Sequence, residues 1–228
     1  MLNWAARYYP ILRVLRQNGL LKSGSLLEIG CGPRGIGTFR KVPFTGCDIN
    51  FPDAPIWPMT PVIASAAELP FEDRSFDAIV ASDVLEHIPS ELRKMVIAEA
   101  LRVGRRLVIF GFPSGTEAHK ADEELRELYI SRHVEVPGWL EEHMLASFPE
   151  GVDFQGLPGW RVAQFGNENI RFHSWMMRRE FSSMFVRMSG VARRAAPWLL
   201  EPLLRQADRP PYYRQIFVLT RLDQIKGY

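Results

Sequence analysis

The sequence lacks the features that mark several large classes of protein. It holds only two cysteines, Cys31 and Cys47, among 228 residues. Two cysteines at this spacing provide neither a disulfide framework nor a zinc site, so we expect free, buried thiols in a reducing cytoplasm. The five histidines show no metal-ligand spacing either, and no metal is expected. A formal net charge of +2 gives no overall electrostatic reason to bind nucleic acid.

Long apolar runs are also absent. Roughly 20 consecutive apolar residues are needed to cross a bilayer as a helix, and no stretch approaches that length. The N-terminal stretch MLNWAARYYPILRVLRQNG carries arginines between its apolar residues and has no small-residue cleavage site. It therefore predicts an amphipathic helix over 4–18 rather than a signal peptide, and a cytoplasmic protein is expected.

What the sequence does contain is an alternation of short apolar runs and helical patterns. The runs predict strands at 25–29, 44–48, 61–65, 75–82, 105–110, 160–165 and 213–221. Helical patterns lie between them, at 89–101, 120–133, 139–148 and 169–206. Such an order is typical of an α/β fold with a parallel sheet covered on both faces. We expect one domain over 1–228, made of an N-terminal helix (1–24), a cofactor-binding half (25–110), a variable substrate-facing region (111–210) and a final strand and tail (211–228).

The first strand runs into a glycine-rich turn, EIGCGPRGIG, with glycines at 30, 32 and 35 in a G-x-G-x-x-G pattern. Glycines at this spacing allow a tight turn, close approach of a ligand, and close packing of the helix that usually follows. NAD, FAD and S-adenosylmethionine enzymes all use such a turn. Pro33 removes one N–H donor that a pyrophosphate would use, which Arg34 could offset.

Carboxylates around the predicted strand ends indicate which of these three ligands is bound. Glu28 precedes the first glycine, Asp48 ends the second strand, and Asp83 and Glu86 follow the fourth. In a doubly wound sheet, these strand ends converge on one crevice. Several carboxylates there suit a ligand with a ribose diol, an ammonium and a sulfonium, and they suit a pyrophosphate poorly. S-adenosylmethionine is therefore favoured over the dinucleotides.

Three segments together resemble the class I S-adenosylmethionine-dependent methyltransferases, and the nearest subgroup is the small bacterial type 11 methyltransferase domain. They are EIGCGPRG, the acid in GCDIN, and ELPFEDRSFDAIVASDVLEHIP. The resemblance covers residues 25–110 well. It implies a Rossmann-like, doubly wound seven-stranded sheet of order 3-2-1-4-5-7-6, with a helical insertion after strand five. The segment YYRQIFVLTR then fits the antiparallel last strand.

The resemblance also implies a role for particular residues at the strand ends. Glu28 would help anchor the glycine loop and the ammonium end, and Asp48 would accept both ribose hydroxyls. In this family the cofactor is bound by residues that match Glu28, Gly30, Cys31, Gly32, Gly35, Asp48, Ile49, Ser65, Ala66, Ala67, Ser82 and Asp83. One position departs from the pattern, because Ser65 stands where many members carry an acid that contacts the adenine amine.

Two histidines are candidates for a catalytic role. His87, in LEHIP, is the histidine nearest the expected methyl group, and it could act as a base or simply cap the sheet edge. His119 has Asp122 one helical turn later; the pair could orient an acceptor hydroxyl or form a solvated contact. The predicted function is methyl transfer to a small-molecule, glycan or lipid-type acceptor. A non-catalytic S-adenosylmethionine-binding partner protein and a NAD-dependent oxidoreductase are the alternatives.

The segment from Arg171 to Arg205 is rich in Arg, Met and aromatic residues. It holds seven basic side chains against two acidic ones. Such a composition suits helices that lie at a membrane surface, and it also suits helices that cap the core with arginines outward. The core arrangement is favoured because the segment lies between two predicted strands of one sheet. Weak peripheral contact with the inner membrane surface is the alternative, and no nucleic-acid partner is expected.

Overall fold

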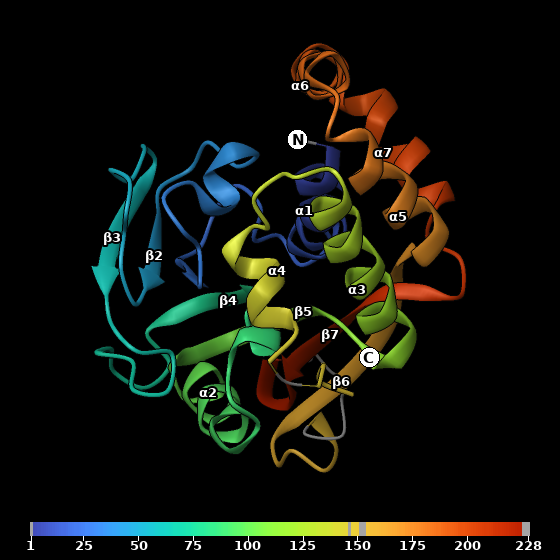
Figure 1. Ribbon diagram of the computed structural model, residues 1–228. Helices are drawn as coiled ribbons and strands as arrows, with labels where there is room; N and C mark the ends of the chain where they lie inside the picture. Colours follow the sequence, from blue (N-terminus) through green and yellow to red (C-terminus); the bar gives the residue numbers. More distant parts are fainter. Residues whose placement is uncertain (1, 146, 151–153, 225–228) are drawn as a thin grey trace.

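The computed structural model describes residues 2–145, 147–150 and 154–224, and its centre is a seven-stranded sheet (Figure 1). In spatial order the strands are β3 (Met59–Ile63), β2 (Phe44–Asp48), β1 (Leu26–Ile29), β4 (Phe76–Ser82), β5 (Gly104–Pro113), β7 (Tyr212–Arg221) and β6 (Trp160–Asn169). β7 runs antiparallel to both of its neighbours, and the first five strands are parallel. The predicted α/β fold and its strand order are confirmed.

Alternating side chains of the central strands divide the core between two helices. Leu26 and Val80 face α1 (Leu2–Gln17), whereas Leu27 and Ile79 face α2 (Ser90–Val103). Successive residues of a strand point to opposite faces, so strands that are apolar throughout bury both faces of the sheet. The first half of α1 reaches the carboxyl ends of these strands, where Arg7 donates to Ser82 at the end of β4.

The predicted bounds of β3 were wrong, and the glycine turn departs from the usual pattern of such turns. β3 begins two residues before the predicted start, so Ser65 lies beyond its end. The glycine turn leads into a short 3₁₀ turn, Gly35–Thr38, rather than an α-helix. Few residues separate this turn from β2, and Gly37 within it touches Phe44 so closely that a Cβ would clash. A short, tight connection therefore replaces the helix.

The second half of the chain adds five helices near the carboxyl edge and beyond it. They are α3 (Gly115–Ser131), α4 (Gly138–His143), α5 (Ile170–Arg179), α6 (Ser183–Ala195) and α7 (Pro197–Gln206). Asn169 begins α5 by accepting hydrogen bonds from the backbone N–H groups of Arg171 and Phe172. The helix predicted over 139–148 ends at His143. Ala146 and the tail residues 225–228 lie outside the described residues.

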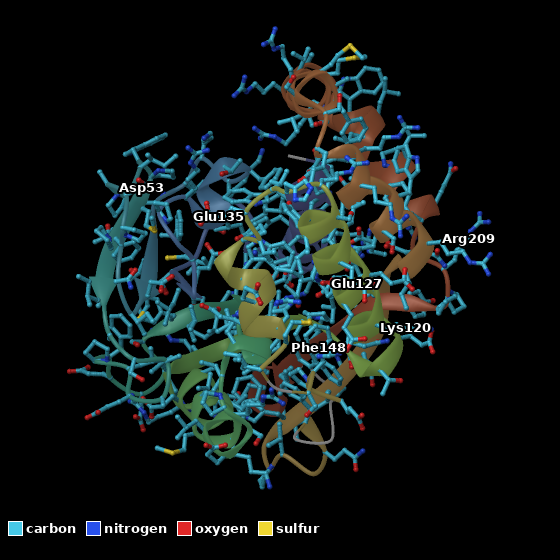
Figure 2. All side chains as sticks on the ribbon, viewed as in Figure 1. Asp53, Lys120, Glu127, Glu135, Phe148 and Arg209 are labelled. Atoms are coloured by element: carbon cyan, nitrogen blue, oxygen red, sulfur yellow. The ribbon has the colours of Figure 1, made fainter. Side chains whose placement is uncertain are left out.

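The preferred interpretation of the Arg171–Arg205 segment, a cap on the core, holds only for part of it. Met176 of α5 and Leu204 of α7 are buried in the core, whereas α6 is not. α6 projects from the body of the molecule, and its side chains extend outward (Figures 1 and 2). Met184 is 69% exposed and Trp198 is 70% exposed. The main contacts of α6 are with α1 and α7 rather than with the sheet, so its apolar side chains cannot join the core. No helix among the described residues is long and apolar enough to cross a membrane.

Candidate active site

The glycine turn lies at the carboxyl end of β1. Gly30, Gly32 and Gly35 all have positive φ angles, of 64°, 53° and 45°, a conformation that glycine adopts most readily. A Cβ on Gly30 would clash with Val84, which follows β4. The turn therefore packs directly against the segment after β4.

Glu28 holds this turn from inside the protein. Its Oε2 accepts a hydrogen bond of 2.6 Å from the N–H of Ile36, and its Oε1 accepts one of 2.8 Å from the Tyr8 hydroxyl. Burial raises the pKa of the Glu28 carboxyl to about 7, although hydrogen bonds from Ile36 and Tyr8 oppose the shift. The loop-anchoring role predicted for Glu28 fits this geometry. The predicted contact with an ammonium group does not, because the carboxylate is buried against the loop and α1.

Asp48 links the glycine turn to the tip of β2. Its Oδ2 accepts a hydrogen bond of 2.8 Å from the N–H of Gly32, and its Oδ1 accepts one of 2.8 Å from the N–H of Ile49. The side chain is only half-buried. A carboxylate has about four lone-pair sites, so both oxygens keep acceptor capacity for a ligand. Asp48 therefore meets the requirement for binding a diol, with the exposed Ile49 beside it.

The turn after β3 lies next to Asp48. The N–H of Ala64 donates to the backbone carbonyl of Asp48 at 3.0 Å, which brings Ser65, Ala66 and Ala67 to the same edge. The Ser65 hydroxyl accepts a hydrogen bond of 3.2 Å from the N–H of Ala67. Ser65 thus has its own local partner, and the edge presents small side chains where the resemblance implies an adenine.

Both cysteines are buried free thiols, as predicted. The Sγ of Cys31 lies 3.5 Å from the Sδ of Met59. Burial raises the pKa of both thiols, that of Cys47 to about 11. They pack between β1, β2 and β3, and a raised pKa makes them poor nucleophiles.

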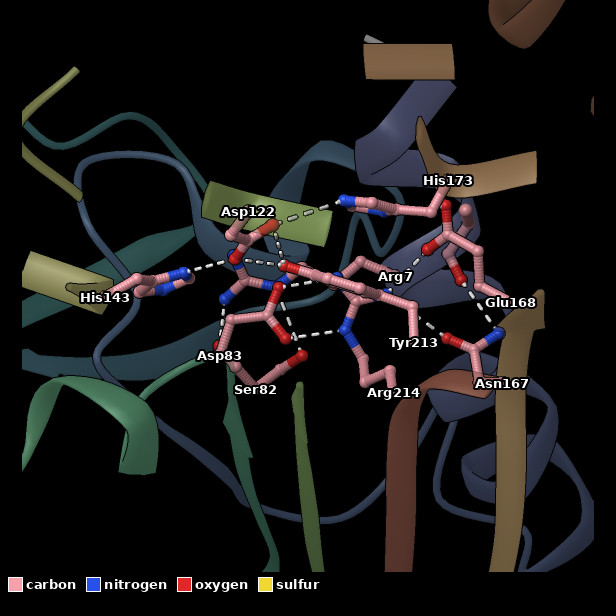
Figure 3. A network of polar contacts seen from close by, with 11 residues as sticks. Arg7, Ser82, Asp83, Asp122, His143, Asn167, Glu168, His173, Tyr213 and Arg214 are labelled. Atoms are coloured by element: carbon pink, nitrogen blue, oxygen red, sulfur yellow. Dashed lines mark hydrogen bonds and ion pairs between the residues drawn. The ribbon is translucent and has the colours of Figure 1, made fainter. Parts of the chain in front are cut away.

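Ser82 and Asp83, predicted to border the cofactor, are instead engaged by arginines from the two ends of the chain (Figure 3). The Nε of Arg7 donates to the Ser82 hydroxyl at 3.1 Å. The Arg214 guanidinium donates two hydrogen bonds to the Asp83 carboxylate, of 2.7 and 2.9 Å. Burial alone would raise the pKa of Asp83, but Arg214 and Arg7 lower it to about 2. The negative charge of Asp83, which was expected to face the cofactor, is therefore paired with two arginines of the protein itself.

Arg214 also bridges to the end of β6. Its Nη1 donates to the Oε2 of Glu168 at 2.9 Å, and Glu168 accepts a further contact of 3.1 Å from the Nδ1 of His173. Asp83 and Glu168 both have positive φ angles, 52° and 63°. Non-glycine residues in this conformation carry backbone strain, which tends to occur at functional sites.

Asp122 of α3 is the second centre of this network (Figure 3). Its Oδ2 lies 2.7 Å from the Nδ1 of His143 and accepts a hydrogen bond of 2.9 Å from the Tyr213 hydroxyl. The predicted pair of His119 with Asp122 is wrong, because Asp122 points into the core. His119 instead lies 3.3 Å from Glu123, one turn further along α3.

The network borders a cavity of about 160 Å³ beyond the end of β4. Its lining includes Trp4 and Arg7 from α1, Trp139 and His143 from α4, and both Glu86 and His87 from the turn after β4. Burial and the nearby Asp83 charge raise the pKa of Glu86 well above its ordinary value. Burial and the neighbouring His143 lower the pKa of His87. Val84, which touches Gly30, lies in the chain between Asp83 and Glu86 of the cavity lining.

Sequence reasoning missed most of this network. Arg7, His143, His173 and Arg214 received no site role, since they lie far apart along the chain, and Asp122 was considered only as a partner of His119. One signal was available: Asp122 shares the inward stripe of α3 with the buried residues Ala118, Ala121 and Leu125. A carboxylate at such a position must find partners inside the protein.

Comparisons with known proteins agree with this geometry. The family described as a methyltransferase domain, type 11, matches residues 27–110. Magnesium protoporphyrin IX methyltransferase from Synechocystis PCC 6803, solved with bound S-adenosylhomocysteine, is 16% identical; the match covers 93% of this chain and 80% of that one, with a TM-score of 0.53. A Galdieria sulphuraria structure, assigned as a sarcosine dimethylglycine methyltransferase, is 17% identical over 96% of this chain and 86% of that one, with a TM-score of 0.55. A search of curated proteins found no match.

The structural similarity extends over nearly the whole chain, whereas the sequence match covers residues 27–110, which carry the glycine turn and Asp48. At such low identity the structural similarity shows the fold alone. The match of residues 27–110 to the type 11 methyltransferase domain, together with this fold, supports an S-adenosylmethionine-dependent methyltransferase.

Proposed function

We propose that the chain binds S-adenosylmethionine across the ends of β1, β2 and β3 and methylates an acceptor held in the adjoining cavity. The observation that supports this proposal is the contact between Gly30 and Val84, because Val84 lies in the chain between two residues that line the polar cavity, Asp83 and Glu86. The methyl group of the cofactor is already activated by its sulfonium. The protein therefore needs mainly to position the two reactants and to exclude water.

The residues present fit such a cofactor. The backbone of the turn at Gly30, Cys31 and Gly32 allows close approach, and Asp48 offers acceptors for two hydroxyls. Ile49 and the turn from Ser65 to Ala67 supply an apolar edge for adenine. These assignments leave Glu28, Ser82 and Asp83 as residues that shape the site without contacting the ligand.

The same residues make a clear prediction about ligand binding. S-adenosylmethionine and S-adenosylhomocysteine should raise the melting temperature, while NAD, NADP and FAD should leave it unchanged. A ligand at 100 times its Kd stabilises the folded state by about 2.7 kcal/mol, which corresponds to roughly 5–10 °C for a chain of this size. Differential scanning fluorimetry measures the melting temperature with each ligand. A rise in melting temperature with NAD alone would contradict the proposal.

The cavity is large enough for the reacting end of an acceptor but too small for a whole large acceptor. Pockets that enclose a drug-sized ligand measure roughly 300–1,000 Å³, so about 160 Å³ holds only part of one. Trp4 and Trp139 supply flat apolar walls, and His87 supplies a polar group. We infer that residues 111–210 form the acceptor-facing region and that His87 faces the reacting atom. His119 does not face it, because the Nε2 of His119 lies 3.1 Å from the backbone carbonyl of His143.

A lipid-type acceptor is supported by the exposed apolar side chains of α6 and α7. This surface, the α6–α7 face, consists of Met184, Met188, Val191, Trp198, Leu199 and Leu203. On α6 the apolar residues recur at helical spacing, and the exposed Arg187 and Arg194 form a parallel stripe beside them. Apolar side chains flanked by arginines match the interface of an anionic membrane. We propose that this face rests on such a membrane and gives access to an acceptor anchored there.

Vesicle binding tests the α6–α7 face. The double variant Met188→Glu, Trp198→Glu should bind anionic vesicles about 100-fold more weakly or worse, since burying each side chain contributes about 1.5–3 kcal/mol. Met95→Glu is the matched control, because Met95 is 52% exposed on α2, away from this face (Figure 1). Sedimentation with phosphatidylglycerol vesicles measures both variants. Equal binding by both, or none by the wild type, would show that the face has another role.

A further inference from the structure

Glu86 has no partner that explains its position. The residue is 2% exposed, and neither carboxylate oxygen has a hydrogen-bond partner among the described residues. A buried carboxylate normally requires hydrogen bonds or a positive charge. Its side chain borders the cavity, so a partner could reach it from there.

Two histidines lie beside Glu86, and each has another carboxylate close to its Nδ1. The Nδ1 of His143 lies 2.7 Å from Asp122, which leaves its buried Nε2 without a partner. The Nδ1 of His87 lies 2.7 Å from Glu142. A histidine that binds a metal usually has its second nitrogen held by a carboxylate or a carbonyl, which fixes the direction of the ring.

The three side chains converge on one point. Glu86 and His87 lie in the turn after β4, and His143 ends α4, so two separate elements supply the group. One ligand atom from each residue lies within 4.8 Å of those from the other two. The rings of His87 and His143 are 4.8 Å apart between centroids. A carboxylate and two imidazoles at such distances form a donor set that suits Zn²⁺ and related first-row metals.

We propose that Glu86, His87 and His143 bind one divalent metal ion of the zinc type at the wall of the acceptor cavity. The ion is the missing partner of the Glu86 carboxylate and of the His143 Nε2. Three protein ligands leave a coordination position open toward the cavity, as in sites where a metal binds water or a substrate. This arrangement requires no contribution from Asp83, whose charge is taken up by Arg214.

The position of the ion also predicts the class of acceptor. This inference rests on the proposed function. A metal beside the reacting atom favours a hydroxyl acceptor, because a cation lowers the pKa of a bound hydroxyl. The hydroxyl gives its proton to solvent, and its oxygen forms a bond to the methyl carbon. The bond between that carbon and the sulfonium sulfur breaks at the same time, and S-adenosylhomocysteine leaves with a neutral sulfur. O-methylation is therefore expected.

Metal binding can be tested without knowing the acceptor. Tag-free protein is dialysed against a chelator and titrated with Co²⁺, whose visible absorption reports coordination, and bound Co²⁺ is then displaced with Zn²⁺. Wild type should take up one equivalent. Glu86→Gln and His143→Gln should each weaken binding by about 100-fold or more, since loss of even an outer-shell partner costs 10–100-fold. His133→Gln is the matched control, because His133 is exposed just after the end of α3 and lies outside the lining of the cavity.

Two results would overturn the site: wild type that binds no Co²⁺, or equal binding by Glu86→Gln and His133→Gln. Circular dichroism checks each fold, and His87→Gln replaces His143→Gln if that variant does not fold. Stabilisation by S-adenosylhomocysteine is measured on the same samples. If stabilisation persists while Co²⁺ binding is absent, the metal site fails and the proposed function stands; if stabilisation is absent, the proposed function fails separately.

Discussion

Replacing Arg214 by methionine should lower the free energy of unfolding by about 3–5 kcal/mol, because it leaves buried carboxylates without their partner. Arg214 is 2% exposed and bonds both Asp83 and Glu168. Methionine fills much of the same space, so lost packing contributes little. Arg214→Lys should be intermediate, since an ammonium keeps the charge but cannot hold Asp83 with two parallel hydrogen bonds. Urea unfolding followed by circular dichroism measures all three proteins.

A surface ion pair of similar length provides the control for Arg214. The Nη1 of Arg105 lies 3.0 Å from Asp77, but the arginine side chain is 48% exposed. Solvent screens such a pair, so Arg105→Met should cost less than about 1 kcal/mol. If the two methionine variants lose similar stability, the buried network does not carry the energy assigned to it here.

The second large effect concerns Asp48. Asp48→Ala should weaken S-adenosylhomocysteine about 100-fold or more, since hydrogen bonds to a charged acceptor contribute roughly 1.5–3 kcal/mol each and 1.4 kcal/mol is tenfold. The carboxylate also accepts the Gly32 N–H, so its loss additionally relaxes the turn that faces the ligand. Asp48→Asn should be intermediate, because the amide oxygen can still accept that N–H while the charge is lost. Isothermal titration measures the affinities.

Asp53→Ala is the control for Asp48, because Asp53 is an exposed acid in the segment between β2 and β3 (Figure 2). It should bind as wild type does. Circular dichroism should show both Asp48 variants folded, since the side chain is half-buried at a strand end and supports no core packing. Equal affinity in folded Asp48→Ala and wild type would mean that Asp48 only shapes the turn, and that the ligand lies elsewhere.

Whether the sequence could predict the role of a residue depends on how near its partners lie along the chain. Asp48 could be placed from the sequence because a strand end and a glycine turn fix its position within a short stretch of chain. Asp83 was placed at the correct strand end, and nothing in the sequence indicated the arginines that pair with it. Its arginines come from α1 and β7, and no local pattern reveals which cation will arrive there. The Glu86, His87 and His143 group was invisible for the same reason, since histidine spacing is informative only when the ligands share one element.

The sequence by itself determined the strands and the glycine turn, because alternation of apolar residues and the needs of a tight turn act over a few residues. The strand order was implied only by the resemblance to a known family. Only the tertiary structure decided the polar interior and the outward direction of α6. Those depend on which distant elements meet: Arg7 and Arg214 reach Asp83 from opposite ends of the chain, and α6 packs on α1 instead of the sheet. A buried charge must be paired wherever the fold places it, so the partner is selected by the three-dimensional packing and not by neighbours in the sequence.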